Sequence, residues 1–253
     1  MRWLECMKEE RKRADGPRII ELSHRMTPGK QRFILDVRSR SVEEYLPNYR
    51  VPEGEWYIMT DVEACTHVGT HVEAPYHAFK EGAQVADLDP RSLIGPAAVV
   101  DFSDKKADQP ISRGEMIEGG AHIEAGDILL IRTGLSRHYL TPKYRRPYIE
   151  TEAVDWLIER GIKALGIDCS GFENRSIDTH EVNHRKLLGR GILIIEDMNN
   201  LDKLKEKRVF FLALPLPIEG LDASWIRPIA VEPIEVGRRL AEIFLGSGTR
   251  WES

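Results

Sequence analysis

The sequence contains little cysteine: three residues in 253, at Cys6, Cys65 and Cys169. An odd number at such wide spacing is not the paired framework of a small disulfide-stapled protein, so we expect reduced thiols. Long apolar runs are missing as well. The most apolar stretch, residues 209–218, contains two prolines and is much shorter than the run of about 20 residues that a membrane-spanning helix needs.

An excess of one charge is also absent, because 36 Lys and Arg face 41 Asp and Glu and give a net charge of −5. The two signs are interspersed, which argues against a basic face for nucleic acid. Residues 1–13 are charged throughout and lack the apolar core and small-residue cleavage site of a signal peptide. We therefore expect a cytoplasmic protein without a nucleic-acid or membrane partner.

The apolar content is sufficient for a core, since 42% of the residues are hydrophobic. Short apolar runs bounded by Gly, Pro and Asp predict buried strands. These runs cover residues 97–100, 128–131, 164–167, 192–195 and 209–212. Residues 151–160 predict a helix with Thr151 as its N-cap and Gly161 at its end. Strands that alternate with helices indicate an α/β fold.

The chain shows no internal repeat and no stretch biased enough to be a domain linker. Residues 30–57 have a less regular pattern than the rest. We expect one domain over residues 19–253, preceded by an N-terminal extension over residues 1–18 that forms an amphipathic helix or a frayed tail.

Three of the eight histidines, His67, His71 and His77, fall within eleven residues. On a helix His67 and His71 would share a face, but Glu73 would point elsewhere and a following proline would break the pattern. In an extended chain the side chains alternate, so all three histidines and Glu73 project to one side. Gly69 leaves room on that side for an ion or ligand. An extended segment is therefore the geometry that gathers these side chains.

Imidazole nitrogen with carboxylate oxygen is the donor set for zinc, manganese or ferrous iron. A single histidine is more often a satisfied polar residue than a ligand, but this coincidence of type and spacing favours a metal site. His180, His184 and Glu196 offer further ligands, and Glu196 follows a predicted strand, where sites in α/β sheets gather. Spacing alone does not choose between the two histidines, and Asp197 fits a turn or cap residue.

Other polar residues fit less specific roles. Cys65 could be a thiol nucleophile, but this leaves the paired histidines unexplained, and a small buried thiol is the ordinary alternative. Thr70 fits a packing or hydrogen-bonding residue better than a nucleophile. The pair Arg145–Arg146 could contact an anionic substrate, although we expect a solvated loop. Asp168 follows a buried strand and could support the site from behind.

The run from His67 to His77 resembles the signature H-x-G-T-H-x-D-x-P-x-H of the cyclase family of metal-dependent hydrolases, which includes bacterial kynurenine formamidase and isatin hydrolase. Every fixed position matches but one, because Glu73 stands where the signature has aspartate. The resemblance extends over residues 19–235. The W-P-G segment that many formamidase-like members carry is not found around residues 28–30.

The resemblance implies that His67 and His71 bind one metal ion and that Glu73 occupies the bridging position. It places His184 and Glu196 on a second ion and so chooses His184 over the other candidate histidine. Glutamate is one methylene longer than aspartate, so it either still bridges two ions or binds one only. We expect one or two divalent ions, zinc or manganese.

The resemblance also implies a swivelling β/β/α domain, with a mixed sheet and flanking helices, in a homodimer or higher homo-oligomer. The implied reaction is hydrolysis of a small amide, either a formamide such as N-formylkynurenine or a cyclic amide such as isatin. A divalent ion lowers the pKa of bound water to about 7, and His77 would act as the general acid/base that protonates the leaving amine. Metal-dependent ring closure or dehydration, and a retired site that only binds a metal or ligand, are the alternatives.

Overall fold

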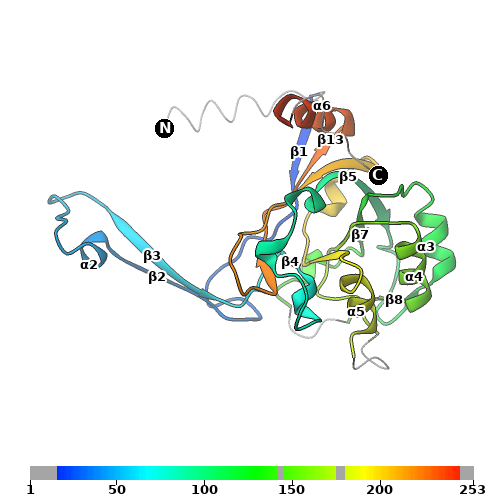
Figure 1. Cartoon of the computed structure of the whole chain (residues 1–253), viewed down its shortest axis with the longest axis horizontal. Helices are drawn as coiled ribbons and strands as arrows, with labels where there is room; N and C mark the ends of the chain where they lie inside the picture. The colour runs from blue at the N-terminus through cyan, green and yellow to red at the C-terminus, as the bar shows by residue number, and fades with distance from the viewer. Residues whose placement is uncertain (1–15, 142–144, 175–179, 246–253) are drawn as a thin grey trace.

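The computed structural model describes residues 16–141, 145–174 and 180–245. Over these residues the chain forms a curled mixed sheet of nine strands in the order β1-β13-β11-β5-β7-β9-β10-β4-β12 (Figure 1). The strands of this sheet are β1 (Arg18–Glu21), β4 (His71–Glu73), β5 (Ile94–Asp101), β7 (Ile128–Arg132), β9 (Ala164–Ile167), β10 (Leu193–Glu196), β11 (Arg208–Leu212), β12 (Ala223–Trp225) and β13 (Ile229–Glu232). With a few flanking helices, this sheet confirms the predicted α/β class.

The predicted apolar runs form the centre of the sheet. Four of them become β5, β7, β9 and β10, which pair in parallel, and the fifth becomes β11, antiparallel to β5. Parallel strands are buried on both faces, which is why their sequences are continuously apolar. Alternate residues enter two separate cores: Leu129 and Ile131 lie on one face, and Ile128 and Leu130 lie on the other.

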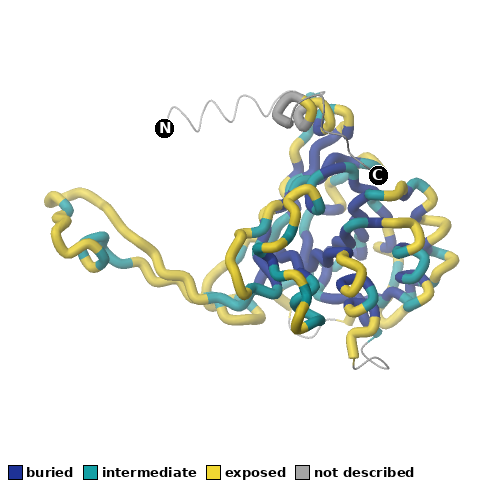
Figure 2. The backbone as a smooth tube through the Cα atoms, viewed as in Figure 1, coloured by how far each residue is buried: buried dark blue, intermediate teal, exposed yellow. Residues whose placement is uncertain are grey.

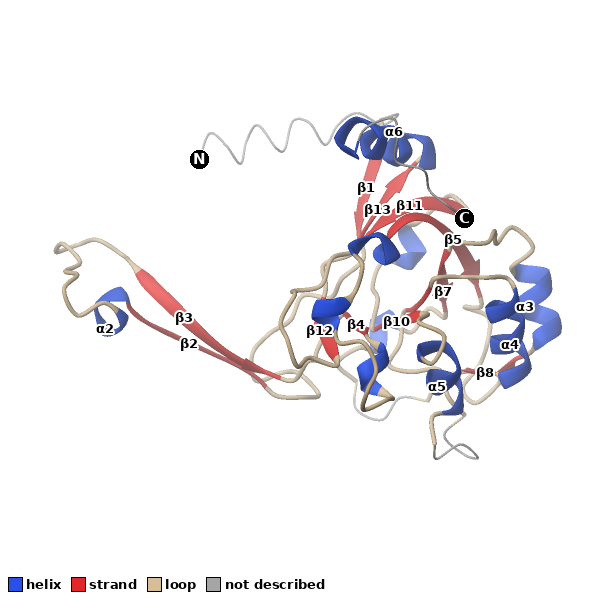
Figure 3. Cartoon of the chain, viewed as in Figure 1, coloured by secondary structure: helices blue, strands red, loops and turns tan. Residues whose placement is uncertain are grey.

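The helices flank the sheet, as Figure 3 shows. They are α3 (Arg113–Gly119), α4 (Thr151–Glu159), α5 (Val182–Leu188) and α6 (Ile234–Leu245). Helices α3, α4 and α5 pack side by side, and Met116, Val154 and Leu187 carry their apolar faces into the core that holds Leu129. Helix α6 packs instead against β11 and β13. Helix α5 also packs against β10.

Helix α4 begins and ends close to its predicted limits. Its N-cap is Glu150, so the predicted N-cap at Thr151 is wrong by one residue. Gly161, with φ of 75°, follows the helix as predicted. The remaining short elements are β6 (Pro110–Ile111), β8 (Tyr148–Ile149) and the 3₁₀ turns η2 (Pro75–His77), η3 (Val85–Asp87), η4 (Pro90–Leu93), η5 (Ser136–His138) and η6 (Leu201–Lys203).

Residues 35–64 form an arm that projects from the body of the molecule (Figure 1). In it β2 (Leu35–Ser41) and β3 (Ile58–Ala64) pair antiparallel, and α2 (Val42–Tyr45) follows β2. Figure 2 shows that most of the arm is exposed. The less regular pattern over residues 30–57 therefore conceals a hairpin. Neither face of it is buried, so no alternation of apolar and polar residues marks its strands.

No helix in the described part of the chain is both long enough and apolar enough to cross a membrane. Strand β1 begins at Arg18, whereas residues 1–15 lie outside the described residues. The helix or tail expected for residues 1–18 therefore stays a prediction over nearly all of its length.

Candidate metal centre

Strand β4 brings the central residues of the site together, because it lies between β10 and β12 and pairs antiparallel with both. In this register His71 lies opposite Glu196 of β10 and opposite Trp225 of β12. Directly opposed residues share a face of a sheet, and residues two apart in a strand do so as well. His71, Glu73 and Glu196 therefore point to the same side.

The rest of the histidine segment is not extended, which corrects the expectation of one continuous strand. His67 lies in a turn ahead of β4, and His77 is the last residue of η2. Gly69 has φ of 75°, and a side chain there would collide with Met26. The glycine thus permits the turn that folds His67 back over the strand, rather than leaving a gap for an ion.

Three ligand atoms meet in a first group, formed by His67, His71 and Glu73. The Nδ1 atom of His67 lies 3.1 Å from Glu73 Oε1 and 3.1 Å from His71 Nε2, and the latter two atoms are 3.6 Å apart. Ligands about 2.0–2.1 Å from a tetrahedral ion are about 3.4 Å from one another. The spacing of these atoms therefore fits a divalent ion between them.

A second group lies on the other side of the same carboxylate, formed by Glu73, His184 and Glu196. The Nε2 atom of His184 lies 3.3 Å from Glu196 Oε1 and 3.7 Å from Glu73 Oε2. All three residues are buried, and Glu73 Oε2 has no hydrogen-bond partner among the described residues. A buried carboxylate oxygen without a partner is unfavourable unless a cation is bound there. The residues present therefore fit a second ion as well.

Each of these imidazoles is oriented by a hydrogen bond from its other ring nitrogen. His67 Nε2 lies 2.8 Å from Asp222 Oδ2, His71 Nδ1 lies 2.8 Å from the Gly69 carbonyl, and His184 Nδ1 lies 2.8 Å from Glu173 Oε1. When these nitrogens donate, the opposite nitrogens present lone pairs to the two groups. This is the support that metal-binding histidines ordinarily have.

His77 lies beside both groups and belongs to neither of those two ligand sets. Its Nδ1 atom lies 2.9 Å from Asp222 Oδ2, and its Nε2 atom lies 3.9 Å from Glu73 Oε1. Asp222 also accepts a hydrogen bond from the Thr66 hydroxyl at 2.9 Å. One carboxylate therefore fixes the rings of His67 and His77 together. The side chain of His77 is 25% exposed, which gives it contact with the cavity in front of the site.

The electrostatics of the site favour bound positive charge. Burial alone would lower the pKa of His67, but hydrogen bonds to Asp222 and Glu73 outweigh it and raise the pKa to about 10. Burial likewise opposes protonation of His184, yet Glu173 and Glu196 raise its pKa well above the usual range. Hydrogen bonds from His67 and His77 hold the pKa of Asp222 well below its usual range. In the absence of metal, protons would take the place of the cations.

Sequence reasoning missed Asp222 and Glu173. Asp222 hydrogen-bonds a histidine 155 positions earlier, and Glu173 lies in a loop ahead of α5, where it accepts hydrogen bonds from both His184 Nδ1 and the His184 backbone N–H. No spacing pattern links residues so far apart. No local pattern in the sequence marks either position.

The remaining candidates lie outside the two ligand groups. His180 is exposed and belongs to neither ligand group. Thr70 donates a hydrogen bond to the Asp197 carbonyl at 2.6 Å, as the hydrogen-bonding alternative predicts. Asp168 accepts hydrogen bonds from the backbone N–H groups of Thr133 and Gly134 and so ties two loops together.

Two further expectations concern reactive or charged side chains. Cys65 is partly buried at the edge of the cavity that contains the two ligand groups, where its carbonyl accepts a hydrogen bond from Trp225 Nε1. The solvated loop expected for Arg145–Arg146 is correct for Arg145 and wrong for Arg146, which is buried. The tight packing of Arg146 against Gly171 explains the difference.

Comparison with known proteins gives consistent relatives. The profile of the Cyclase family, described as "Putative cyclase", matches residues 20–174. The chain is 32% identical to a kynurenine formamidase of Bacillus thuringiensis (strain Al Hakam) over 171 residues, which cover 66% of this chain and 77% of the relative. A kynurenine formamidase of Bacillus mycoides (strain KBAB4) is 31% identical over the same shares.

Solved structures agree on the fold. Isatin hydrolase A from Ralstonia solanacearum superposes with a TM-score of 0.73 at 23% identity, over 90% of this chain and 96% of the other. An isatin hydrolase bound to the product analogue thioisatinate gives a TM-score of 0.73 at 20% identity, over 92% and 98%. Because the profile spans more than half of the sequence and the formamidases are matched over most of their length, this chain belongs to the cyclase family.

Proposed function

We propose that this protein is a metal-dependent hydrolase that cleaves the C–N bond of a small amide. One observation carries the proposal: the two oxygens of Glu73 face two different sets of imidazole and carboxylate groups, and the buried Oε2 has no hydrogen-bond partner among the described residues. A carboxylate so placed is suited to bridge two cations. Imidazole and carboxylate donors suit zinc or manganese.

We assign His67, His71 and Glu73 to one ion, and Glu73, His184 and Glu196 to the other. The longer side chain of Glu73 is compatible with this bridge, because His67 folds back toward its Oε1 atom. A divalent ion bound here would polarise the amide carbonyl and lower the pKa of water to about 7. The protein itself would hold the two ligand groups at this spacing.

His77 would move the proton that amide cleavage requires. An amine is a poor leaving group unless it is protonated, and imidazole exchanges protons near neutral pH. The Nε2 atom of His77 points toward Glu73, whereas its Nδ1 atom is held by Asp222. His77 can therefore take a proton on the side of the reacting water and return it to the leaving nitrogen on the same side.

The substrate class follows from the relatives. They are named kynurenine formamidase and isatin hydrolase, so a formamide such as N-formylkynurenine and a cyclic amide such as isatin are the candidate substrates. Both reactions add water across a C–N bond next to a carbonyl group. Incorporation of solvent ¹⁸O into the product separates hydrolysis from ring closure or dehydration.

The test begins with the full chain purified without chelators. Elemental analysis should find two zinc or manganese ions per chain, and turnover of N-formylkynurenine or isatin should disappear on chelation and return with the metal. A preparation that binds no transition metal after supplementation would overturn the proposal. If a metal-loaded preparation turns over neither amide, the result supports the alternative that the site binds a metal or ligand without catalysis.

We propose further that the protein is a homodimer and that the arm forms part of the dimer contact. An isolated two-stranded hairpin is at best marginally stable in water, and within the described residues β2 and β3 pair only with each other. The arm exposes large apolar side chains, among them Trp56, which is 80% exposed, and Val62. Symmetric dimers are the commonest assembly in which one such surface is covered by its own copy.

A further inference from the structure

Arg146 is buried beside the site, and no carboxylate of the described residues forms a salt bridge with it. Only 7% of the residue is exposed, whereas Arg145 is exposed and pairs with Asp108. The Nε atom of Arg146 is buried and has no hydrogen-bond partner, and no carboxylate of the described residues lies within ion-pairing distance of the guanidinium. The Asp197 carboxylate is near enough to interact with the charge of Arg146 but forms no salt bridge with it. The guanidinium is therefore able to bind a further anion.

The guanidinium lies on the wall between two adjoining cavities. One, of about 390 Å³, contains both ligand groups; the other, of about 480 Å³, opens beside it. The two cavities share the five lining residues Arg32, Phe33, His67, Arg146 and Ser170. A molecule whose amide carbon lies at the ligand groups can therefore extend past Arg146 into the second cavity.

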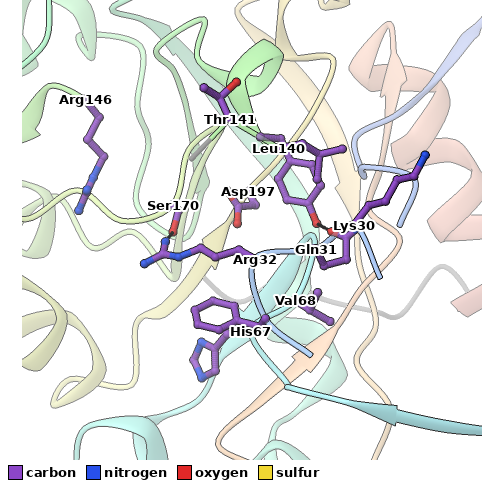
Figure 4. Close-up of a pocket in the computed structure, with 13 residues that line it drawn as sticks. Lys30, Gln31, Arg32, His67, Val68, Leu140, Thr141, Arg146, Ser170 and Asp197 are labelled. Carbon is purple, nitrogen blue, oxygen red and sulfur yellow. Dashed lines mark hydrogen bonds between the residues drawn. The ribbon is translucent and has the colours of Figure 1, made fainter. Parts of the chain in front are cut away.

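The second cavity carries further donors near this wall. The Arg32 guanidinium donates a hydrogen bond to Ser170 Oγ at 3.0 Å. Figure 4 shows these two side chains meeting, with Arg146 on the same side of the picture and Lys30 on the opposite side. Two guanidinium groups and a hydroxyl are the groups that bind a carboxylate, because arginine can donate two parallel hydrogen bonds to it.

The backbone is shaped to admit the Arg146 side chain at this position. Gly171 has φ of 81°, and a Cβ there would lie 2.5 Å from Arg146 Nη2 and 3.5 Å from Glu196 Oε1. Any other residue would push the guanidinium away from the ligand groups. The glycine therefore keeps the guanidinium packed next to them.

This step rests on the proposed function, which places two divalent ions beside this wall. Their four positive charges would face the carboxylates of Glu73, Glu196, Glu173 and Asp222, and Asp197 lies near both guanidinium groups. Charge is therefore close to balanced here, and Arg146 favours a substrate carboxylate through its position between the two cavities rather than through an excess of positive charge.

We propose that Arg146, with Arg32 and Ser170, binds a carboxylate that the substrate carries in addition to its scissile amide. The preferred substrate is then a formamide of a carboxylic acid, in the manner of N-formylkynurenine, rather than a neutral cyclic amide such as isatin. Arg146 sets this specificity through one additional charged contact and takes no part in the bond cleavage.

A matched pair of substrates tests the proposal: N-formylkynurenine and its methyl ester, with the metal-loaded full chain. The wild type should prefer the acid, and Arg146→Gln should lower the acid-to-ester ratio of kcat/KM by roughly 10- to 100-fold, mainly through KM. The control is Arg145→Gln, which should leave the ratio unchanged. Arg32→Gln should lower the ratio by a smaller factor, and because Arg32 is exposed this variant should fold even if Arg146→Gln does not.

Calorimetric titration with kynurenine and its methyl ester provides a second measurement that needs no turnover. Wild type should bind the acid more tightly than the ester, and Arg146→Gln should remove the difference. The carboxylate assignment is overturned if Arg146→Gln weakens the binding of acid and ester equally, or if the wild type binds both with the same affinity. The hydrolase proposal stands in either case. If neither amide is turned over but the acid still binds through Arg146, the hydrolase proposal fails and the carboxylate site stands.

Discussion

Glu73 is the residue on which both ligand groups depend, because each of its oxygens faces a different group. Glu73→Gln would keep the shape of the side chain and remove its charge. We expect metal content to fall from two ions per chain to one or none, and turnover to fall by more than the roughly 10- to 100-fold that outer-shell changes produce. Metal analysis with an amidase assay measures both.

The control for this prediction is Glu63→Gln on the exposed strand β3, which should alter neither metal content nor rate. Two ions per chain in Glu73→Gln would show that the carboxylate does not bridge.

Asp222 orients two imidazole rings, and under the proposed function it would act on the reaction through them. Asp222→Asn keeps one acceptor but cannot hold both imidazole N–H groups with a charged oxygen, so His67 and His77 should lose their fixed orientation. We expect kcat to fall roughly 10- to 100-fold with little change in KM. Steady-state kinetics tests this against Asp202→Asn, an exposed carboxylate that should be silent. An unchanged kcat would assign Asp222 a purely structural role.

At the scale of elements, the turn before β4 decides whether His67 reaches the site. Gly69→Ala places a side chain at positive φ and against Met26, whereas Gly191→Ala has a similar φ of 72° and open space around it. We expect the first variant to be destabilised by about 2–4 kcal/mol and the second by about 1–2 kcal/mol. Denaturant unfolding of the metal-free proteins compares them. Equal losses would show that only the backbone strain matters.

The exposed arm leads to a prediction about the oligomeric state. Replacement of Trp56 and Val62 by serine should leave the fold and the metal content intact but shift the protein from dimer to monomer, because the apolar surface of the arm is lost. Light scattering after size exclusion measures the mass. Ile19→Ser is the matched control, since Ile19 is equally prominent at 68% exposure but lies on β1. A wild type that is already monomeric would contradict the dimer.

At the scale of the whole molecule, metal and pH should act together on stability. In the metal-free protein the pKa of His67 is raised to about 10, above its value near 6.5 in the unfolded chain. Its contribution is therefore complete below pH 6.5 and is lost as the pH rises toward 10. Metal binds the deprotonated rings, so the loaded protein should not lose stability over this range. The increase in Tm caused by metal should thus grow with pH.

Thermal unfolding at pH 6.5, 8 and 9.5, with and without a chelator, measures this difference. His138→Gln, which changes a half-buried histidine outside both ligand groups, should leave the trend in place. A metal effect on Tm that shrinks as the pH rises would contradict the linkage.

The central sheet could be predicted from the sequence because its strands are buried on both faces, so β5, β7, β9, β10 and β11 appear as continuous apolar runs. Strands β4 and β12 have three residues each, too few for any period to be recognised. The arm has no buried face and so no alternation. Strands could therefore be predicted where their burial requires a recognisable run of apolar residues.

The site was predictable in its residue types and only in part in its geometry. His67, His71 and Glu73 could be grouped by spacing, but the turn at Gly69 replaces the expected strand because the nearby Met26 and Tyr139 occupy that side. The choice of His184 over His180 came from the family resemblance, because spacing did not distinguish them. Arg146 was assigned to solvent because its burial depends on packing against Gly171, which no local pattern encodes.

Among the described residues, strand β4 pairs only with β10 and β12, which come later in the chain, and His67 is hydrogen-bonded to Asp222. During synthesis the histidines therefore leave the ribosome well before the partners that arrange them. The finished geometry exists only once Trp225 has emerged. If the proposed metal ions bind as assigned, they are acquired late in synthesis, and a nascent chain stalled ahead of β12 would carry the histidines without the partners that arrange them.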